Sequence, residues 1–530
     1  MKRIFSVYRE FYKGNRFNIS FYVFLLFLYR VSHFLFPITA AAVIDSAAYF
    51  YNMDIFISAV LMLALSGVVY AIVLPLRFYY EKKIEAGAFI FVVKNVISKI
   101  PFLKQDKSQE VSTGHIMQLI SADADQTKNL AVTEIALISI EIVYTTAIIA
   151  LLIHTHVFMA LIVGIILIVF IIASKFFVPR LQSQHEKIVN EKDEINDLAD
   201  ETLNGLVAIK LSNAHDFIAK KINKITSVYY KSVVKYTKKE VTYEDAIVSG
   251  MLVAGTVFIY VLGAFFVIRG ELTIGAITLI ALFFNILWGT IQYLMIMLKE
   301  VGVNMVSVDR ILNFSNLPVE KMDGEAIDEF RSLKVRNLYY SYADNVVFEN
   351  AHLTINKGDK ILLKGANGSG KSTLNKLLLG LISPSSGSIS YNNTEISDLS
   401  LCSLRERVVL VPAEPYIFPG DLNEINFGRD YESSYFANTI FENMEYDGQS
   451  LSSGEKKRLQ LLREIARSGD FYIFDEPLNF IDDANKKEAA RLISEVLTDK
   501  TVIIISHEPG FFDFCNKRYE LDNKSIIEIK

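Results

Sequence analysis

The chain has 530 residues, of which 51% are hydrophobic and 21% charged, and its mean hydropathy is +0.30. This length is too great for one ordinary core, and this composition is more apolar than a soluble enzyme needs. The formal net charge of −5, without a clustered basic surface, argues against nucleic acid as a partner. Two cysteines, Cys402 and Cys515, lie far apart and suggest neither a disulfide framework nor a Cys-based metal site.

Six apolar stretches in the first 300 residues are long enough, at roughly 20 residues each, to cross a bilayer as helices. Cationic residues precede the first stretch and favour a cytoplasmic N-terminus, and the stretch is too long for a cleaved signal peptide. The sequence thus predicts a multi-pass protein of the cytoplasmic (inner) membrane, with the lipid bilayer as a partner. The expected spans are 18–43, 54–77, 132–153, 156–178, 245–268 and 274–298.

The connections between the spans alternate in length, being short after the first, third and fifth spans and long after the second and fourth. Both long connections are rich in Lys, Glu and Asp with helical periodicity, so we expect the helices to continue beyond the bilayer into the cytoplasm. Residues 112–125 and 201–211 lie where these connections turn. They are the predicted contact points for a second, cytoplasmic domain.

Ionisable side chains inside apolar spans are costly and therefore informative. Arg30 and His33 lie in the first span, and Glu134 and Glu141 lie in the third. Arg30 and Glu141 are predicted either to form an ion pair that holds helices together or to line a substrate cavity.

A phosphate-binding loop follows the apolar strand expected at 360–364 and precedes the helix expected at 374–379. Its glycines let main-chain N–H groups converge on phosphates, Lys371 supplies positive charge to the terminal phosphates, and Ser372 can bind Mg²⁺. The loop therefore predicts ATP and Mg²⁺ as cofactors. The expected nucleotide-binding residues in it are Gly365, Asn367, Gly368, Ser369, Gly370, Lys371, Ser372 and Thr373.

A second acidic element lies about a hundred residues further on, where the apolar strand expected at 471–474 leads into Asp475 and Glu476. An acid at the end of a strand beside a phosphate loop suits metal positioning, so Asp475 joins Ser372 as a predicted metal ligand. Glu476 is placed to polarise an attacking water. Together with the phosphate loop, the pair predicts hydrolysis.

Between these elements, residues 451–460 read Leu-Ser-Ser-Gly-Glu-Lys-Lys-Arg-Leu-Gln and resemble the signature of ATP-binding cassette (ABC) transporters. In that family the signature opens a helix and, in an antiparallel dimer, caps the γ-phosphate held by the partner's phosphate loop. Ser453 and Glu455 stand where the family usually has Gly and Gln, and a helix-capping role could also explain them. The residues implied to contact the partner's ATP are Ser452, Ser453, Gly454 and Glu455.

The resemblance extends to three further positions. Tyr342 matches the aromatic residue that stacks on adenine, with a strand-core aromatic as the alternative. His507 matches the switch histidine, which joins Lys371 and Glu476 as the implied catalytic residues. Asp482 matches the D-loop, which communicates across the dimer.

The segment after Val411 departs from the family pattern, because the glutamine expected to touch Mg²⁺ and the water is Ala413, with Glu414 beside it. In this degenerate Q-loop either Glu414 substitutes for the glutamine or the coupling is looser, and we predict slow but real hydrolysis. The stretch from Ala413 to Leu451 is also shorter than typical exporters use for their helical subdomain. Such a compact cassette is similar to the group that exports cyclic peptides and siderophore precursors.

The resemblance covers nearly the whole chain and implies an exporter-type half-transporter. The expected domains are an α-helical membrane domain at 1–315, a linker at 316–332, and an α/β phosphate-loop NTPase (ABC) domain at 333–530 in the cytoplasm. Because the first span begins close to the N-terminus, we expect no peptidase or substrate-binding domain ahead of it.

The implied function is ATP-driven export of a peptide-like, lipid or drug-like amphipathic substrate by alternating access of a dimer. A homodimer is preferred because Glu476 is present, and a heterodimer stays open. Two alternatives also stay open: an importer built on the exporter fold, and an ATP-gated channel or regulator with very slow hydrolysis.

Overall fold

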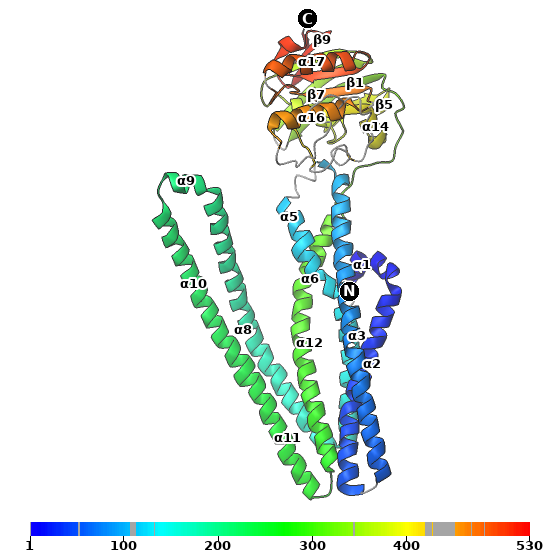
Figure 1. The fold of residues 1–530 in the computed structure, drawn as a ribbon, viewed down its shortest axis with the longest axis vertical. Coiled ribbons are helices and arrows are strands. Elements are labelled where there is room, and N and C mark those ends of the chain that lie inside the picture. Colours follow the sequence, from blue (N-terminus) through cyan, green and yellow to red (C-terminus); the bar gives the residue numbers. More distant parts are fainter. Residues whose placement is uncertain are drawn as a thin grey trace. The chain divides into compact units, whose positions relative to one another are not determined.

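The computed structural model describes residues 2–50, 53–105, 113–131, 133–342, 345–418, 427, 451–467, 469–481 and 483–529. The chain forms two compact units, both traced along the sequence in Figure 1. The first, here the helical unit, comprises Met1–Ile97 and Met117–Ser315. The second, here the sheet unit, comprises Ser98–Ile116 and Asn316–Lys530.

Helices make up nearly all of the described chain before Ser315. Helices suit a membrane because each satisfies its main-chain N–H and C=O groups internally. In chain order they are α1 (Lys2–Gly14), α2 (Arg16–Asp45), η1 (Ser46–Phe50), α3 (Met53–Lys99), η2 (Ile100–Phe102), α5 (Thr113–Gln118), η3 (Leu119–Asp123), α6 (Ala124–Ala131), α7 (Thr133–Thr155), α8 (Val157–Asn204), α9 (Leu206–Leu211), α10 (His215–Val241), η4 (Thr242–Ser249), α11 (Gly250–Ile268) and α12 (Ile274–Ser315).

The predicted six membrane spans are confirmed, since six helical segments of the described chain are long and apolar enough to cross a membrane. The predicted extension of the helices beyond the apolar spans is confirmed as well. Helices α3 and α8 have 47 and 48 residues, or roughly 70 Å at 1.5 Å per residue, against about 30 Å of hydrocarbon. The six segments are Arg16–Tyr49, Met53–Phe102, Ala136–Thr155, Val157–Leu181, His215–Ile268 and Ile274–Met297.

Helices α8 and α10 lie side by side and are joined by the short helix α9 (Figure 1). Elsewhere in the helical unit, the start of α12 is fixed to the end of α2 by one carboxylate. Asp45 accepts hydrogen bonds from the Gly275 main-chain N–H at 2.7 Å and from the Thr273 hydroxyl at 2.6 Å. Gly275 is required there, because a Cβ would lie 2.3 Å from the carbonyl oxygen of Ala41.

Two sheets form the core of the second unit, and they confirm the predicted α/β class. A four-stranded antiparallel sheet has the order β2-β1-β4-β5, and a six-stranded sheet has the order β10-β9-β3-β8-β7-β6. The strands are β1 (Ser332–Tyr342), β2 (Asn345–Asn356), β3 (Lys360–Gly365), β4 (Ser386–Tyr391), β5 (Thr394–Glu395), β6 (Val408–Val411), β7 (Phe471–Asp475), β8 (Thr501–Ile505), β9 (Lys517–Asp522) and β10 (Ser525–Ile529).

The centre of the six-stranded sheet is buried, since every residue of β7 and of β8 is buried. Such continuous apolar runs are typical of parallel strands covered on both faces. The helices of this unit are α13 (Lys371–Leu378), α14 (Leu401–Arg407), α16 (Ser453–Ile465), α17 (Asp483–Val496) and the short η6 (Pro509–Phe511).

The middle of the long connection between the second and third spans, Ser98–Ile116, belongs to the sheet unit. Leu103 pairs with Val319 as an antiparallel bridge, and the Glu320 N–H donates to the Phe102 carbonyl at 2.7 Å. The Glu320 carboxylate in turn accepts two hydrogen bonds from the Arg405 guanidinium of α14, at 2.6 and 2.9 Å. These contacts attach the chain around 102–104 and 318–320 to the body of the sheet unit.

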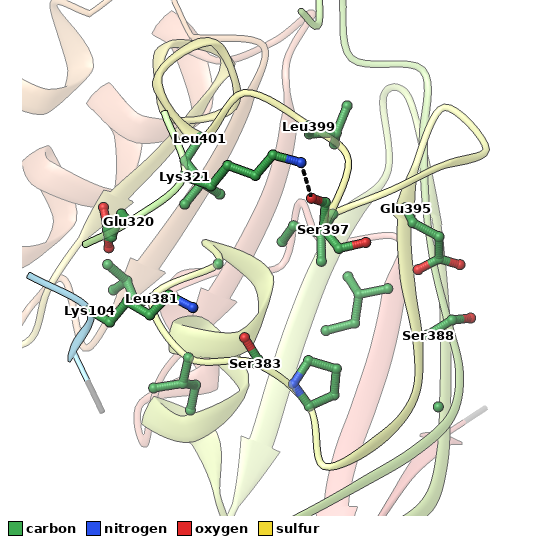
Figure 2. A pocket seen from close by; sticks show the side chains of 16 residues that line it. Lys104, Glu320, Lys321, Leu381, Ser383, Ser388, Glu395, Ser397, Leu399 and Leu401 are labelled. Atoms are coloured by element: carbon green, nitrogen blue, oxygen red, sulfur yellow. Dashed lines mark hydrogen bonds between the residues drawn. The ribbon is translucent and has the colours of Figure 1, made fainter. Parts of the chain in front are cut away.

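A cavity of about 410 Å³ lies beside this attachment (Figure 2). Its lining includes Lys104, Glu320 and Lys321, and the Lys321 ammonium donates to the Ser397 carbonyl at 3.4 Å. The predicted nucleotide-binding residues are not among the residues that line it.

Candidate nucleotide-binding site

The order of the six-stranded sheet brings four predicted segments to one edge. Strands β3, β8, β7 and β6 are adjacent and parallel, so their carboxyl ends meet at the same edge of the sheet. The phosphate loop follows β3, His507 follows β8, the Asp475–Glu476 pair ends β7, and the Ala413 segment follows β6. Ligands of open parallel sheets bind at this edge.

The phosphate loop is an open turn between β3 and α13. Gly368 and Gly370 have φ angles of 82° and 102°, which favour glycine. The Lys371 ammonium arches back across the loop and donates to the Gly365 carbonyl at 2.7 Å and the Ala366 carbonyl at 3.2 Å. The Ser369 hydroxyl is buried and has no hydrogen-bond partner among the described residues. A phosphate oxygen would supply the missing acceptor, so the loop fits a nucleotide.

Asp475 and Ser372, the two predicted metal ligands, lie together. Asp475 is buried and accepts a hydrogen bond from the Asn375 amide at 3.1 Å. Burial raises the pKa of Asp475, and hydrogen bonds from Asn375 and Ser372 and the positive charge of Lys457 oppose that rise. A bound cation would favour the ionised carboxylate in the same way, so this oxygen-donor pair fits Mg²⁺.

Glu476 and His507 also come together at the edge of the sheet. Glu476 has a φ of 46°, an uncommon conformation for a residue with a side chain, and its N–H donates to the Ile505 carbonyl at 2.9 Å. His507 Nε2 lies 3.4 Å from Glu476 Oε1, and the His507 side chain is 57% exposed. The arrangement leaves a carboxylate and an accessible imidazole beside the phosphate loop, where they could hold a water and a phosphate oxygen.

The four signature residues lie at the N-terminus of α16, where Ser452 and Glu455 form a capping box. Glu455 accepts a hydrogen bond from the Ser452 N–H at 2.8 Å, and the Ser452 hydroxyl accepts one from the Glu455 N–H at 3.3 Å. Hydrogen bonds from the Ser452 hydroxyl and N–H lower the pKa of Glu455. Gly454 passes close to the main chain, because a Cβ there would lie 2.7 Å from the Phe480 carbonyl. Capping therefore accounts for Ser452 and Glu455, while contact of these residues with a partner's nucleotide stays a prediction.

Tyr342 ends β1 with its side chain 37% exposed and its ring edge-on to Tyr340, 5.0 Å away. This exposure does not support the strand-core alternative, and adenine stacking stays a prediction. Ala413 and the exposed Glu414 follow β6 as expected. Asp482 lies outside the described residues.

Two residues of the site, Asn375 and Lys457, are not predicted from the sequence. Asn375 appeared as an ordinary position of the helix, although a polar residue three positions after Ser372 faces the same side. Lys457 lies in a run of three cations, which local patterns assign to a solvated face. It is nevertheless 0% exposed and donates to the Pro412 and Ala413 carbonyls at 2.7 and 3.0 Å.

The helical unit has a separate candidate site, a cavity of about 370 Å³ lined by side chains of α2 and α12. Arg30 lines this cavity and is also ion-paired with Glu141, which is 0% exposed. The predicted ion pair is therefore confirmed. The same arginine borders a cavity, and binding of a substrate in that cavity stays a prediction. His33 lines the cavity as well, and its Nδ1 lies 2.8 Å from the Tyr144 hydroxyl.

Two family models match the chain. Residues 19–291 match the ABC transporter transmembrane region, and residues 348–479 match the ABC transporter model. The chain is similar in structure to a bacterial Atm1-family ABC exporter with ATP bound, with a TM-score of 0.80 and 16% sequence identity. The match covers 97% of this chain and 96% of that exporter. That likeness shows the fold.

Curated relatives of the chain include proteins from several bacteria. A lactococcin-G-processing and transport ATP-binding protein of Lactococcus lactis is 26% identical over 63% of this chain, and the pediocin PA-1 transport/processing ATP-binding protein of Pediococcus acidilactici is 28% identical over 63%. The chain spans only 51% and 49% of these two proteins. A Bacillus subtilis protein named for multidrug export is 21% identical over 79% of this chain and 76% of its own length.

Proposed function

The chain belongs to the ABC transporter family, and from this premise we propose that it is an exporter subunit that couples ATP hydrolysis to movement of a peptide-like substrate across the cytoplasmic membrane. The observation that carries the proposal is the edge of the six-stranded sheet, where the phosphate loop, Asp475, Glu476 and His507 meet in a chain that also has six candidate spans.

In this proposal the main-chain N–H groups of the phosphate loop and the Lys371 ammonium hold the ATP phosphates. Lys371 would exchange its present bonds to the Gly365 and Ala366 carbonyls for phosphate oxygens. Ser372 and Asp475 would hold Mg²⁺, which neutralises charge that develops on the phosphates. Glu476 orients the attacking water and His507 contacts the γ-phosphate.

A second copy would complete the site. The phosphate loop and Glu476 belong to one side of it, and the signature at the start of α16 would cap the γ-phosphate of the partner. Glu476 is present, so two equivalent sites in a homodimer are preferred, with a heterodimer as the alternative. ATP would close the dimer, and hydrolysis would reset it.

The cavity beside Arg30 supports a peptide-like substrate. Arg30 provides donors for a carboxylate or for peptide carbonyls, and its charge is already balanced by Glu141, so the cavity does not require a strongly anionic ligand. Asn285 and Thr290 add polar groups to the lining. The relatives named for lactococcin G and pediocin PA-1 transport point in the same direction. Lipid and drug-like substrates remain alternatives, because one fold serves many chemistries.

The test of hydrolysis is phosphate release by purified protein in proteoliposomes. Glu476→Gln should lower the turnover at least roughly 100-fold while ATP still binds. The matched control is Glu495→Gln on the exposed face of α17, which should leave turnover unchanged. Equal phosphate release by wild type and Glu476→Gln would contradict the proposed role and favour the ATP-gated channel.

The test of the substrate site uses the same vesicles and a panel of peptides, lipids and drugs. Arg30→Ala and Glu141→Ala should change substrate-stimulated ATPase more than basal ATPase. Direction follows from the side of the vesicle on which a labelled substrate accumulates, and accumulation on the cytoplasmic side would favour an importer.

A further inference from the structure

One face of α16 is polar and buried, although helices usually bury an apolar stripe. Three side chains on this face, spaced three residues apart, donate to main-chain carbonyls of the segment after β6. We refer to them as the polar ladder: Lys457, Gln460 and Arg463, which are 0%, 0% and 5% exposed. The acceptors are the carbonyls of Pro412 (2.7 Å) and Ala413 (3.0 Å) for Lys457, of Glu414 (3.4 Å) for Gln460, and of Tyr416 (3.3 Å) for Arg463.

Lys457 is the costliest member of the ladder. A buried ammonium is expensive unless it is fully hydrogen-bonded, and a methionine of similar length would pack there without that cost. Two charge-assisted bonds to neighbouring carbonyls partly offset the cost and fix the position of the chain at Pro412 and Ala413. Burial lowers the pKa of Lys457 to about 8, and the nearby charges of Asp475 and Glu476 oppose that shift. Lys457 thus lies close to the acidic pair as well as to the segment after β6.

The register of the sheet explains this closeness. Val411 pairs with Phe474, so Pro412 continues β6 alongside Asp475 at the end of β7. Residue 413 itself has only a methyl group to present to the site. The main chain that Lys457 holds at Pro412 and Ala413 therefore gives this segment a route to the acidic pair that does not need a side chain at residue 413.

We propose that Lys457 is a positioning residue that ties the segment after β6 to the signature helix, so that both move as one body. The position of the start of α16 would then depend on the nucleotide of the partner subunit. The main chain at Pro412 and Ala413 would shift together with α16, at the edge of the sheet beside Asp475. Hydrolysis in the two sites of the dimer becomes coupled through one side chain in each copy. This inference rests on the proposed ATPase function and goes beyond it by naming how one site senses the other.

The experiment measures ATP turnover of the full chain in proteoliposomes over a range of ATP concentrations. Lys457→Met should lower kcat by between about tenfold and 100-fold, because displacement of the segment misplaces groups near the chemistry. The KM for ATP should stay within about threefold, since the phosphate loop is untouched. The cooperative dependence on ATP should disappear. Lys457→Arg can donate to both carbonyls and should recover most of the turnover and the cooperativity.

Lys456→Met is the matched control, because it removes the same charge from the neighbouring position, which is not part of the ladder. Unchanged kcat and cooperativity in folded Lys457→Met would overturn the proposal. So would a loss of activity that equals the loss of nucleotide-binding stoichiometry, since that is the result of a merely structural role. If Lys457→Met does not fold, Lys457→Gln is measured by the same criteria. Absence of hydrolysis in the wild type, by contrast, would count against the proposed function, as the Glu476→Gln comparison shows separately.

Discussion

A buried ion pair in the helical unit links η3, in the connection between the second and third spans, to α12. Asp123 ends the π-helical turn η3 and is 0% exposed. It accepts hydrogen bonds from Arg310 Nε at 2.9 Å and from the Ser307 hydroxyl at 2.7 Å, both on α12. The Arg310 side chain is 33% exposed, so water can solvate it if the pair is broken. Loss of Arg310 should therefore lower the free energy of unfolding more than loss of the Asp123 charge does.

Arg310→Met should lower the free energy of unfolding by about 3–5 kcal/mol, because it leaves the Asp123 carboxylate buried with one hydroxyl for a partner. Asp123→Asn should cost about 1–2 kcal/mol, because the amide oxygen still accepts from Arg310 and the guanidinium reaches water. At roughly 2–4 °C per kcal/mol, Arg310→Met should lower the midpoint of heat denaturation in detergent by about 10 °C. The double variant should cost less than the sum, since the two residues share one interaction.

The matched control is Arg3→Met, which breaks an exposed pair with Asp309, the residue before Arg310. Exposed pairs contribute about 1 kcal/mol or less, so this variant should barely change the midpoint. Equal shifts for Arg310→Met and Asp123→Asn, or additive effects in the double variant, would refute the reasoning from burial.

Three further outcomes follow from the sheet unit. Burial raises the pKa of Cys515 to about 12, so a maleimide at pH 7.5 should label only the exposed Cys402, and Cys402→Ser should abolish labelling of the folded chain. Ser452→Ala should lower stability without nucleotide by about 1 kcal/mol through loss of the cap on α16, whereas Ser452→Thr should preserve it in the same thermal assay. The pKa of Lys457 is lowered from 10.5 to about 8, so between these pH values the unfolded chain binds a proton that the folded chain lacks. The stability of wild type relative to Lys457→Met should therefore rise from pH 7 to pH 10, and a flat difference would contradict the burial of a depressed ammonium.

The features predicted from the sequence are those that depend on short, local patterns of residues. The six spans follow from the length of apolar runs, and the phosphate loop follows from glycines and Lys371 between a strand and a helix. The Arg30–Glu141 pair was foreseeable because an unpaired charge in a bilayer is costly. These features need no knowledge of how distant segments pack.

The features not predicted depend on tertiary packing. The sequence places β3, β6, β7 and β8 far apart, and only their order in the sheet puts His507 next to Glu476. Lys457 lies in a run of three cations, which local patterns assign to a solvated face. Its burial results from the path of the chain after β6, and no local pattern specifies that path. The capping box, in contrast, was readable from Ser452 and Glu455 alone.

The arrangement at the sheet edge also bears on why one copy would not suffice. In the sheet unit, the phosphate loop, the acidic pair and His507 approach the expected position of the γ-phosphate from strand ends of one sheet, and therefore from one side. Ser452 and Glu455 of the same chain hydrogen-bond to each other at the start of α16. A γ-phosphate bound there would lack a cap on its open side. The start of α16 of a second copy would supply that cap. The polar ladder would then connect each cap to the sheet edge of the cap's own chain. In the proposed dimer, hydrolysis at one ATP site is thus expected to be coupled to hydrolysis at the other.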